Sequence, residues 1–178
     1  GLDLTSYVVF VLAVLVICIT PGPDMIYILT HGISQGTKAG LLAALGMSAG
    51  MACHTLAVAL GVAAVIGSSH VAYEVLRYAG AAYLLYMAWQ TLRDSSGTSV
   101  GDSRETVPLG TVFRRATITN LLNPKIVLFY LAFLPQFVTA SAGSPGLQLL
   151  VLGLTFTVLG LLVDALIALL SGQIGERL

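Results

Sequence analysis

Four ionisable side chains stand within long apolar stretches of this sequence: Asp24, His54, Lys125 and Asp164. A charge at the centre of a lipid bilayer costs at least about 2.5–3.5 kcal/mol, so an ionisable residue in such a stretch indicates a functional role. These groups could bind a polar solute, and a carboxylate in surroundings of low dielectric readily takes up a proton. We therefore select Asp164 and His54 as candidates for proton coupling. For His54, a hydrogen-bonded packing role is the alternative.

Proline interruptions accompany two of these residues. Asp24 ends the run Pro21-Gly22-Pro23-Asp24, and Lys125 ends the run Asn123-Pro124-Lys125. Proline removes a backbone hydrogen bond from a helix, and inside a bilayer the freed groups need partners from protein or water. Matching interruptions in two halves of a membrane protein indicate a transporter binding site. The alternatives are prolines that merely kink packed helices and a structural ion pair between Asp24 and Lys125. Substrate binding is predicted for the residues at and before the breaks: Pro21, Gly22, Pro23, Asp24, Asn120, Asn123, Pro124 and Lys125.

Helical spacing predicts which way Asp164 faces. Small and polar residues recur every three or four positions along its segment: Gly153, Thr157, Gly160, Asp164, Ala168 and Ser171. Residues at this spacing share one face of a helix, so Asp164 is expected to face other helices or a cavity rather than lipid. The pair Gly46 and Gly50 forms a small-x-x-x-small motif that permits close helix contact, on the same face as His54.

The composition indicates a membrane protein. Of 178 residues, 57% are hydrophobic and only 9% are charged, whereas a soluble domain carries about 25% charged residues. A membrane helix needs about 20 apolar residues, and five stretches qualify, of which the first and fourth contain the breaks: about 4–29, 39–66, 71–92, 112–138 and 147–170. The prediction is an all-α, polytopic transmembrane helix bundle with two proline-broken helices.

The chain is predicted to be a single transmembrane transport domain, 1–178, that is built from two halves. The first half covers about 1–93 and the second about 111–178, and a polar loop at about 94–110 joins them. Breaks at equivalent positions and an odd number of helices in each half indicate two three-helix halves that are inverted in the membrane. Because the second half contains only two apolar stretches, its third helix, the sixth of the protein, is expected to be missing from this chain.

The lysines and arginines between the stretches predict the orientation. Cytoplasmic loops of membrane proteins carry an excess of these residues. The loops on one side of the membrane hold six basic residues: Lys38, Arg93, Arg104, Arg114, Arg115 and Arg177. The loops on the other side hold only Arg77. The loop 93–110 is therefore predicted to be cytoplasmic, with the N-terminus outside.

Several classes of function lack their sequence signals. The net charge is zero and no basic tract is present, so no nucleic-acid partner is expected. No hydrolase motif occurs, and neither His54 nor the thiols are grouped with carboxylates, so we expect no enzyme, no metal site and no cofactor. Cys18 and Cys53 are predicted to be buried apolar thiols. A thiol electron carrier and a non-transporting membrane scaffold remain as alternative functions.

Short motifs occur in order along nearly the whole chain. After the first break come Ser34-Gln35-Gly36, Ala39-Gly40, Gly80-Ala81-Ala82-Tyr83-Leu84 and Trp89, and after the second comes Phe133-Leu134-Pro135-Gln136-Phe137. Together with the two breaks, these motifs resemble the LysE/RhtB family of bacterial amino-acid exporters. Members of that family carry Asn or Asp at the position of Asp24.

The resemblance implies export of an amino acid or a close derivative from the cytoplasm across the bacterial inner membrane, driven by the proton gradient. It also implies a multi-pass protein in the lipid bilayer that can form homodimers. The substrate would bind between the two breaks, with its ammonium at Asp24 or Asp164. Its carboxylate would meet Lys125, or amide groups where a broken helix restarts, because helix N-termini favour anions.

Overall fold

The fold is entirely helical in the part of the chain that the structure describes. This structure, a computed structural model, describes residues 3–68, 106–139 and 143–178, together with scattered residues between 70 and 93. The predicted helix 71–92 and the polar loop that follows it therefore lie largely outside the described residues. The described helices are α1 (Leu4–Ile19), α2 (Pro23–Gln35), α3 (Thr37–Ser68), α5 (Leu109–Leu122), α6 (Pro124–Leu128), the π-helical turn η1 (Phe129–Phe133), the 3₁₀ turn η2 (Leu134–Phe137) and α7 (Pro145–Arg177).

The first proline run separates α1 from α2. Helix α1 ends at Ile19, Thr20 is extended, and α2 begins at Pro23. Proline is tolerated in this first position because the first N–H groups of a helix have no partner within it. The two helices are bent by 54° at the break. The predicted interruption is confirmed, and the broken span continues to Gln35, beyond the predicted end near residue 29.

The second proline run separates α5 from α6, with a bend of 48°. Asn123 caps α6, because its side-chain oxygen accepts a hydrogen bond of 3.0 Å from the backbone N–H of Lys125. The α-helical pattern ends after Leu128 and changes to the π turn and then the 3₁₀ turn. Pro135 has no N–H and cannot continue an α-helical ladder. The sequence predicted one helix from the break to about residue 138, so this change of hydrogen bonding is an unpredicted feature.

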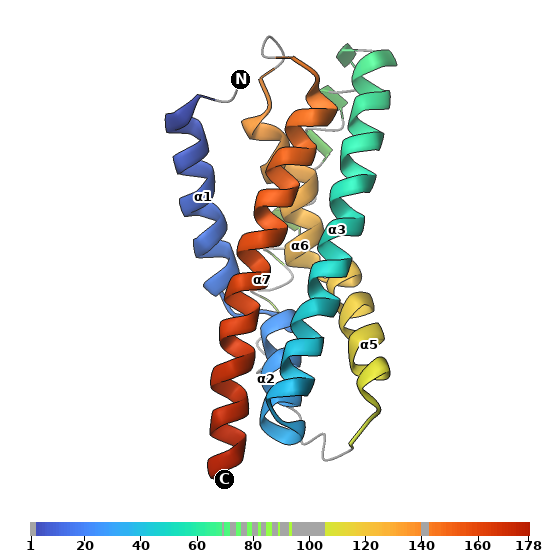
Figure 1. The fold of residues 1–178 in the computed structure, drawn as a ribbon. Helices are drawn as coiled ribbons and strands as arrows, with labels where there is room; N and C mark the ends of the chain where they lie inside the picture. Colours follow the sequence, from blue (N-terminus) through green and yellow to red (C-terminus); the bar gives the residue numbers. More distant parts are fainter. Residues whose placement is uncertain are drawn as a thin grey trace.

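Helices α3 and α7 are long, and each could cross a membrane alone, by length and composition. They lie side by side along the bundle, while α1 and α2 follow one another end to end (Figure 1). The two bent pairs could each form a further span. They run in opposite directions, since α1 and α2 lead away from the end that holds the N-terminus and α5 and α6 lead back toward it (Figure 1). The inversion of complete three-helix halves stays a prediction.

Small residues allow the helices to approach closely. A side-chain carbon added at Gly172 of α7 would collide with Thr37 at the start of α3. One added at Gly46 would collide with Ala116 of α5, so the predicted close contact of the small-x-x-x-small motif is confirmed. Large apolar side chains cover the outer faces of α1 and α7, as expected for surfaces against lipid: Leu4, Val8, Leu12, Val16, Ile19, Leu154, Val158, Leu162 and Leu166.

Candidate functional site

The two breaks meet at the middle of the bundle, and Asp24 lies at their junction. Asp24 is buried, with 7% of its surface exposed. Its carboxylate accepts hydrogen bonds from the side-chain amides of Asn120, at 2.6 Å, and Asn123, at 2.8 Å. Both asparagines are themselves buried and come from the end of α5. The first turn of α2 is thus attached to the second break by two charge-assisted hydrogen bonds.

Lys125 attaches the second break to the end of α1. Its ammonium donates hydrogen bonds to the backbone carbonyl oxygens of Ile17, at 3.1 Å, and Thr20, at 2.9 Å. The C-terminal end of a helix carries partial negative charge, which favours a cation there. No direct ion pair joins Lys125 to Asp24 among the described residues. The structural ion pair that the sequence left open is therefore wrong, because each charge takes its partners from the opposite break.

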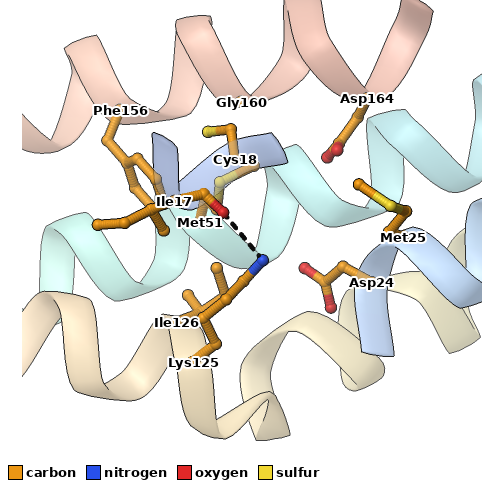
Figure 2. A pocket seen from close by; sticks show the side chains of 10 residues that line it. All are labelled: Ile17, Cys18, Asp24, Met25, Met51, Lys125, Ile126, Phe156, Gly160 and Asp164. Carbon is orange, nitrogen blue, oxygen red and sulfur yellow. Dashed lines mark hydrogen bonds between the residues drawn. The ribbon is translucent and has the colours of Figure 1, made fainter. Parts of the chain in front are cut away.

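Asp164 approaches the same point from α7. It is buried, with 9% of its surface exposed, and its carboxylate points into the space between Lys125 and Met25 (Figure 2). No hydrogen bond or ion pair reaches this carboxylate from the described part of the chain. Its stripe of small and polar residues faces the interior as predicted, since Gly160 and Ala168 are buried with it.

A small cavity lies among these three charged groups. Its volume is about 20 Å³, room for about one water molecule. Besides Asp24, Lys125 and Asp164, the cavity is lined by apolar groups of five helices: Ile17, Cys18, Met25, Met51, Ile126, Phe156 and Gly160. An amino acid needs several times this volume, so the cavity as described is too small to hold one.

The remaining predicted residues occupy the edges of the site. Gly22 lies beside Lys125, since a side-chain carbon added there would come 3.4 Å from the ammonium nitrogen. Pro21, Pro23 and Pro124 form the breaks without lining the cavity. Asn120 and Asn123 lie behind Asp24 and hold it in place, rather than facing the cavity.

His54 lies apart from the cavity. It is half-buried on α3, and its ring stacks on Tyr130 with centroids 5.4 Å apart. Its Nε2 is buried and has no hydrogen-bond partner among the described residues, and the same holds for the side-chain oxygen of Asn120. The position suits a packing role at least as well as proton coupling, and the coupling role stays a prediction.

Sequence reasoning did not find the apolar lining of the cavity. Met25, Met51 and Phe156 line it, but apolar residues fill every span and carry no signal that marks one face. The prediction of two buried thiols holds only in part. Cys18 is partly buried and lines the cavity, whereas Cys53 is exposed on α3.

The site contains two carboxylates and one ammonium. The negative charge of Asp24 is stabilised by two amides, and the positive charge of Lys125 by two carbonyls. The second carboxylate, on Asp164, is left without a donor in a region of low dielectric. A buried carboxylate in that position requires a proton or a cation. The site can therefore accept a positive group from a ligand.

Broken helices that bring opposite charges together around a cavity are typical of membrane transport proteins. The sequence matches the LysE type translocator family over residues 15–178, and the chain belongs to that family. It is thus a multi-pass membrane translocator and not an enzyme.

Among its relatives is the leucine efflux protein of Salmonella typhimurium strain LT2. This relative is 34% identical over 154 residues, which cover 86% of this chain and 73% of the relative. The leucine efflux protein of Klebsiella pneumoniae is 32% identical over 176 residues, covering 97% and 81%. An uncharacterized membrane protein of Vibrio cholerae serotype O1 is 29% identical over 175 residues, covering 98% and 85%. No solved structure matches this chain.

Proposed function

We propose that this protein exports an amino acid with an apolar side chain, of the leucine type, from the cytoplasm of a bacterium across its inner membrane. The observation that carries the proposal is the cavity at the meeting point of the two breaks, which combines charges of both signs with an apolar wall. The names of the relatives, leucine efflux proteins, support the same substrate class.

The chemistry of the lining favours an aliphatic side chain. Met25, Met51 and Ile126 present thioether and hydrocarbon groups to the cavity, and methionine adapts its shape to apolar ligands. The ammonium of the substrate would pair with Asp164, the carboxylate that lacks a donor. The side chain of lysine would bring a second ammonium against a thioether and hydrocarbon wall, where desolvation of a charge is costly.

Binding requires the closed cavity to open. Phe156 lines the cavity, and its ring continues into an aromatic cluster, with centroids 4.1 Å apart for Phe156 and Phe129 and 6.2 Å apart for Phe129 and Phe10. Helix α2, whose first turn lines the cavity, packs against α3 and α7. Alternating movement of half-helices about the two breaks would expose the cavity first to the cytoplasm and then to the outside.

Asp164 is the proposed site of proton coupling. With substrate present, its carboxylate would pair with the ammonium, and without substrate it would carry a proton. Exchange of one for the other would link export of the amino acid to entry of a proton. His54 is the second candidate, but its distance from the cavity lining makes it secondary.

Counterflow in proteoliposomes tests the proposed function. Vesicles with the purified protein are loaded with unlabelled leucine, and uptake of trace radiolabelled leucine is measured. We expect accumulation that excess external leucine or methionine suppresses and that lysine or threonine does not. No counterflow with any amino acid would refute export, and suppression by lysine as strong as that by leucine would refute the apolar substrate class.

A further inference from the structure

The C-terminal end of α1 already holds a primary ammonium group, and that group belongs to the protein. Lys125 reaches the carbonyl oxygen of Ile17 across the junction of the breaks (Figure 2) and also that of Thr20. These carbonyls belong to the last turn and the cap of a 16-residue helix, where partial negative charge is greatest. The ammonium of an amino acid has the same charge and the same donors, so it would suit the same two acceptors.

The start of α2 offers the opposite charge a few residues further on. Helix α2 has 13 residues, and its cap, Gly22, makes no side-chain hydrogen bond to its first turn. The backbone N–H groups of Asp24 and Met25 have no partner within the helix. Both residues line the cavity. A carboxylate placed there would meet N–H donors and the positive end of the helix dipole.

Asp164 points independently to a cationic ligand at the same place. It is nine-tenths buried, lacks a donor among the described residues, and faces the cavity beside Lys125 (Figure 2). Once Asp164 has released its proton, the single ammonium of Lys125 cannot neutralise two carboxylates, so the cavity can then hold a second positive group.

We infer that the break between α1 and α2 is a subsite for both ends of a zwitterion, and that Lys125 fills its ammonium half while no substrate is bound. This inference rests on the proposed function and names the subsite and its internal occupant. The ammonium of the substrate replaces that of Lys125 at the Ile17 and Thr20 carbonyls, next to Asp164. The substrate carboxylate lies at the start of α2, where the displaced Lys125 is its neighbour.

The consequence is a separation of two transport modes. Exchange moves substrate in both directions, so the ammonium half is filled by substrate during every crossing. Net export also requires the empty protein to return, and among the described residues Lys125 is the cation that then meets the carbonyls at the end of α1. Net export therefore depends on the Lys125 ammonium more strongly than exchange does.

Lys125→Met and Lys125→Gln test this separation in proteoliposomes. The amide of the glutamine variant can still donate to the two carbonyls, so this variant supports folding where methionine does not. In both variants we expect net efflux of leucine to fall by at least about tenfold, because the empty site lacks its cation. Leucine exchange should fall at least about threefold less than net efflux, since substrate itself fills the ammonium half during exchange. An equal fall of the two rates would overturn the inference. Lys38→Met, which removes an exposed lysine at the start of α3, is the control for both assays.

Chemical labelling supplies a measure of binding that does not depend on transport. Cys53→Ser removes the exposed thiol, so Cys18 in the cavity remains for N-ethylmaleimide. Leucine should still slow labelling of Cys18 when glutamine replaces Lys125. Loss of both exchange and protection in the Lys125 variants would overturn the inference while leaving the proposed function intact. Unchanged net efflux in both variants would overturn it too. Absence of all transport in the unmodified protein would refute the proposed function itself, and the inference with it.

Discussion

Asp24 and Asp164 are two carboxylates with different surroundings, and the difference separates their roles. Asp24 receives amide hydrogen bonds at 2.6 and 2.8 Å, so its charge is stabilised whether or not a ligand is present. Asp164 has no comparable donor in the described chain. The first is suited to holding the two breaks together, and the second to exchanging one positive partner for another.

Replacement of Asp164 by asparagine should uncouple transport from protons. In Asp164→Asn we expect an inward proton gradient to lose its stimulation of leucine efflux, because the side chain no longer takes up and releases a proton. Exchange should persist at about a tenth of its rate, since a neutral oxygen replaces a charged acceptor for the ammonium. Efflux is measured with and without the gradient. Glu176→Gln, at an exposed position near the end of the same helix, is the matched control. Full stimulation in Asp164→Asn would exclude the coupling role.

Asn123 offers a graded test of the support for Asp24. Asn123→Ser keeps an oxygen that can cap α6 but removes the amide that donates to Asp24. A hydrogen bond to a charged group contributes about 1.5–3 kcal/mol. Leucine exchange should therefore fall by about tenfold or more. Asn123→Asp adds a second carboxylate beside Asp24 and should lower exchange further. Counterflow and detergent stability are measured for both variants. An aspartate variant that is as active as the unmodified protein would contradict the arrangement.

At the scale of elements, the sequence predicted the breaks because proline acts locally. The interruptions near Pro23 and Pro124 and the long helices α3 and α7 lie close to their predicted positions. The π and 3₁₀ turns from Phe129 to Phe137 were not predicted. An apolar sequence pattern does not specify to which backbone carbonyl each N–H donates its hydrogen bond. The facing of Asp164 followed from helical spacing. The partners of Lys125 did not, since they depend on how two distant breaks meet.

The contact between α3 and α5 should tolerate no side chain at Gly50. An added carbon there would lie 2.5–2.9 Å from the side chain of Asn120, which is one of the two residues that hold Asp24. We expect Gly50→Ala to reduce stability by about 1–3 kcal/mol, the usual cost of overpacking, and to reduce leucine exchange. Thermal unfolding in detergent and counterflow are the measurements. Gly61→Ala on the same helix is the control, because nothing lies within 4 Å of the added carbon. Equal stability of the two variants would show that α3 and α5 are further apart.

At the scale of the whole molecule, the described basic residues of the loops gather at one end. Lys38 begins α3, Arg114 and Arg115 lie in the first half of α5, and Arg177 ends α7. The end of α2 is joined to the approach to α5 by a hydrogen bond of 2.9 Å from Gln35 to the carbonyl oxygen of Val107. These helix ends therefore lie together at one end of the bundle (Figure 1). This arrangement agrees with the prediction that the basic loops share one side. That this face is cytoplasmic is a prediction.

Labelling of single cysteines tests this orientation. In a chain with Cys18→Ser and Cys53→Ser, Gly101→Cys lies in the polar loop and Ser141→Cys lies between η2 and α7. With a membrane-impermeant maleimide, the first should react in inside-out vesicles and the second in right-side-out vesicles. The opposite result would reverse the orientation, and with it the direction in which the cavity must open to the cytoplasm.

The hydrogen bonds from Lys125 to the end of α1 also set an order of events during synthesis. Lys125 follows Thr20 by 105 residues, and a ribosome takes about 5–20 s to add that many at roughly 5–20 residues per second. Throughout this interval the carbonyls at the end of α1 lack the cation that later binds them, and exposed backbone groups are not stable in lipid. The first broken span should therefore remain in contact with water or with the insertion machinery until the second broken span arrives, so the two are expected to enter the lipid together.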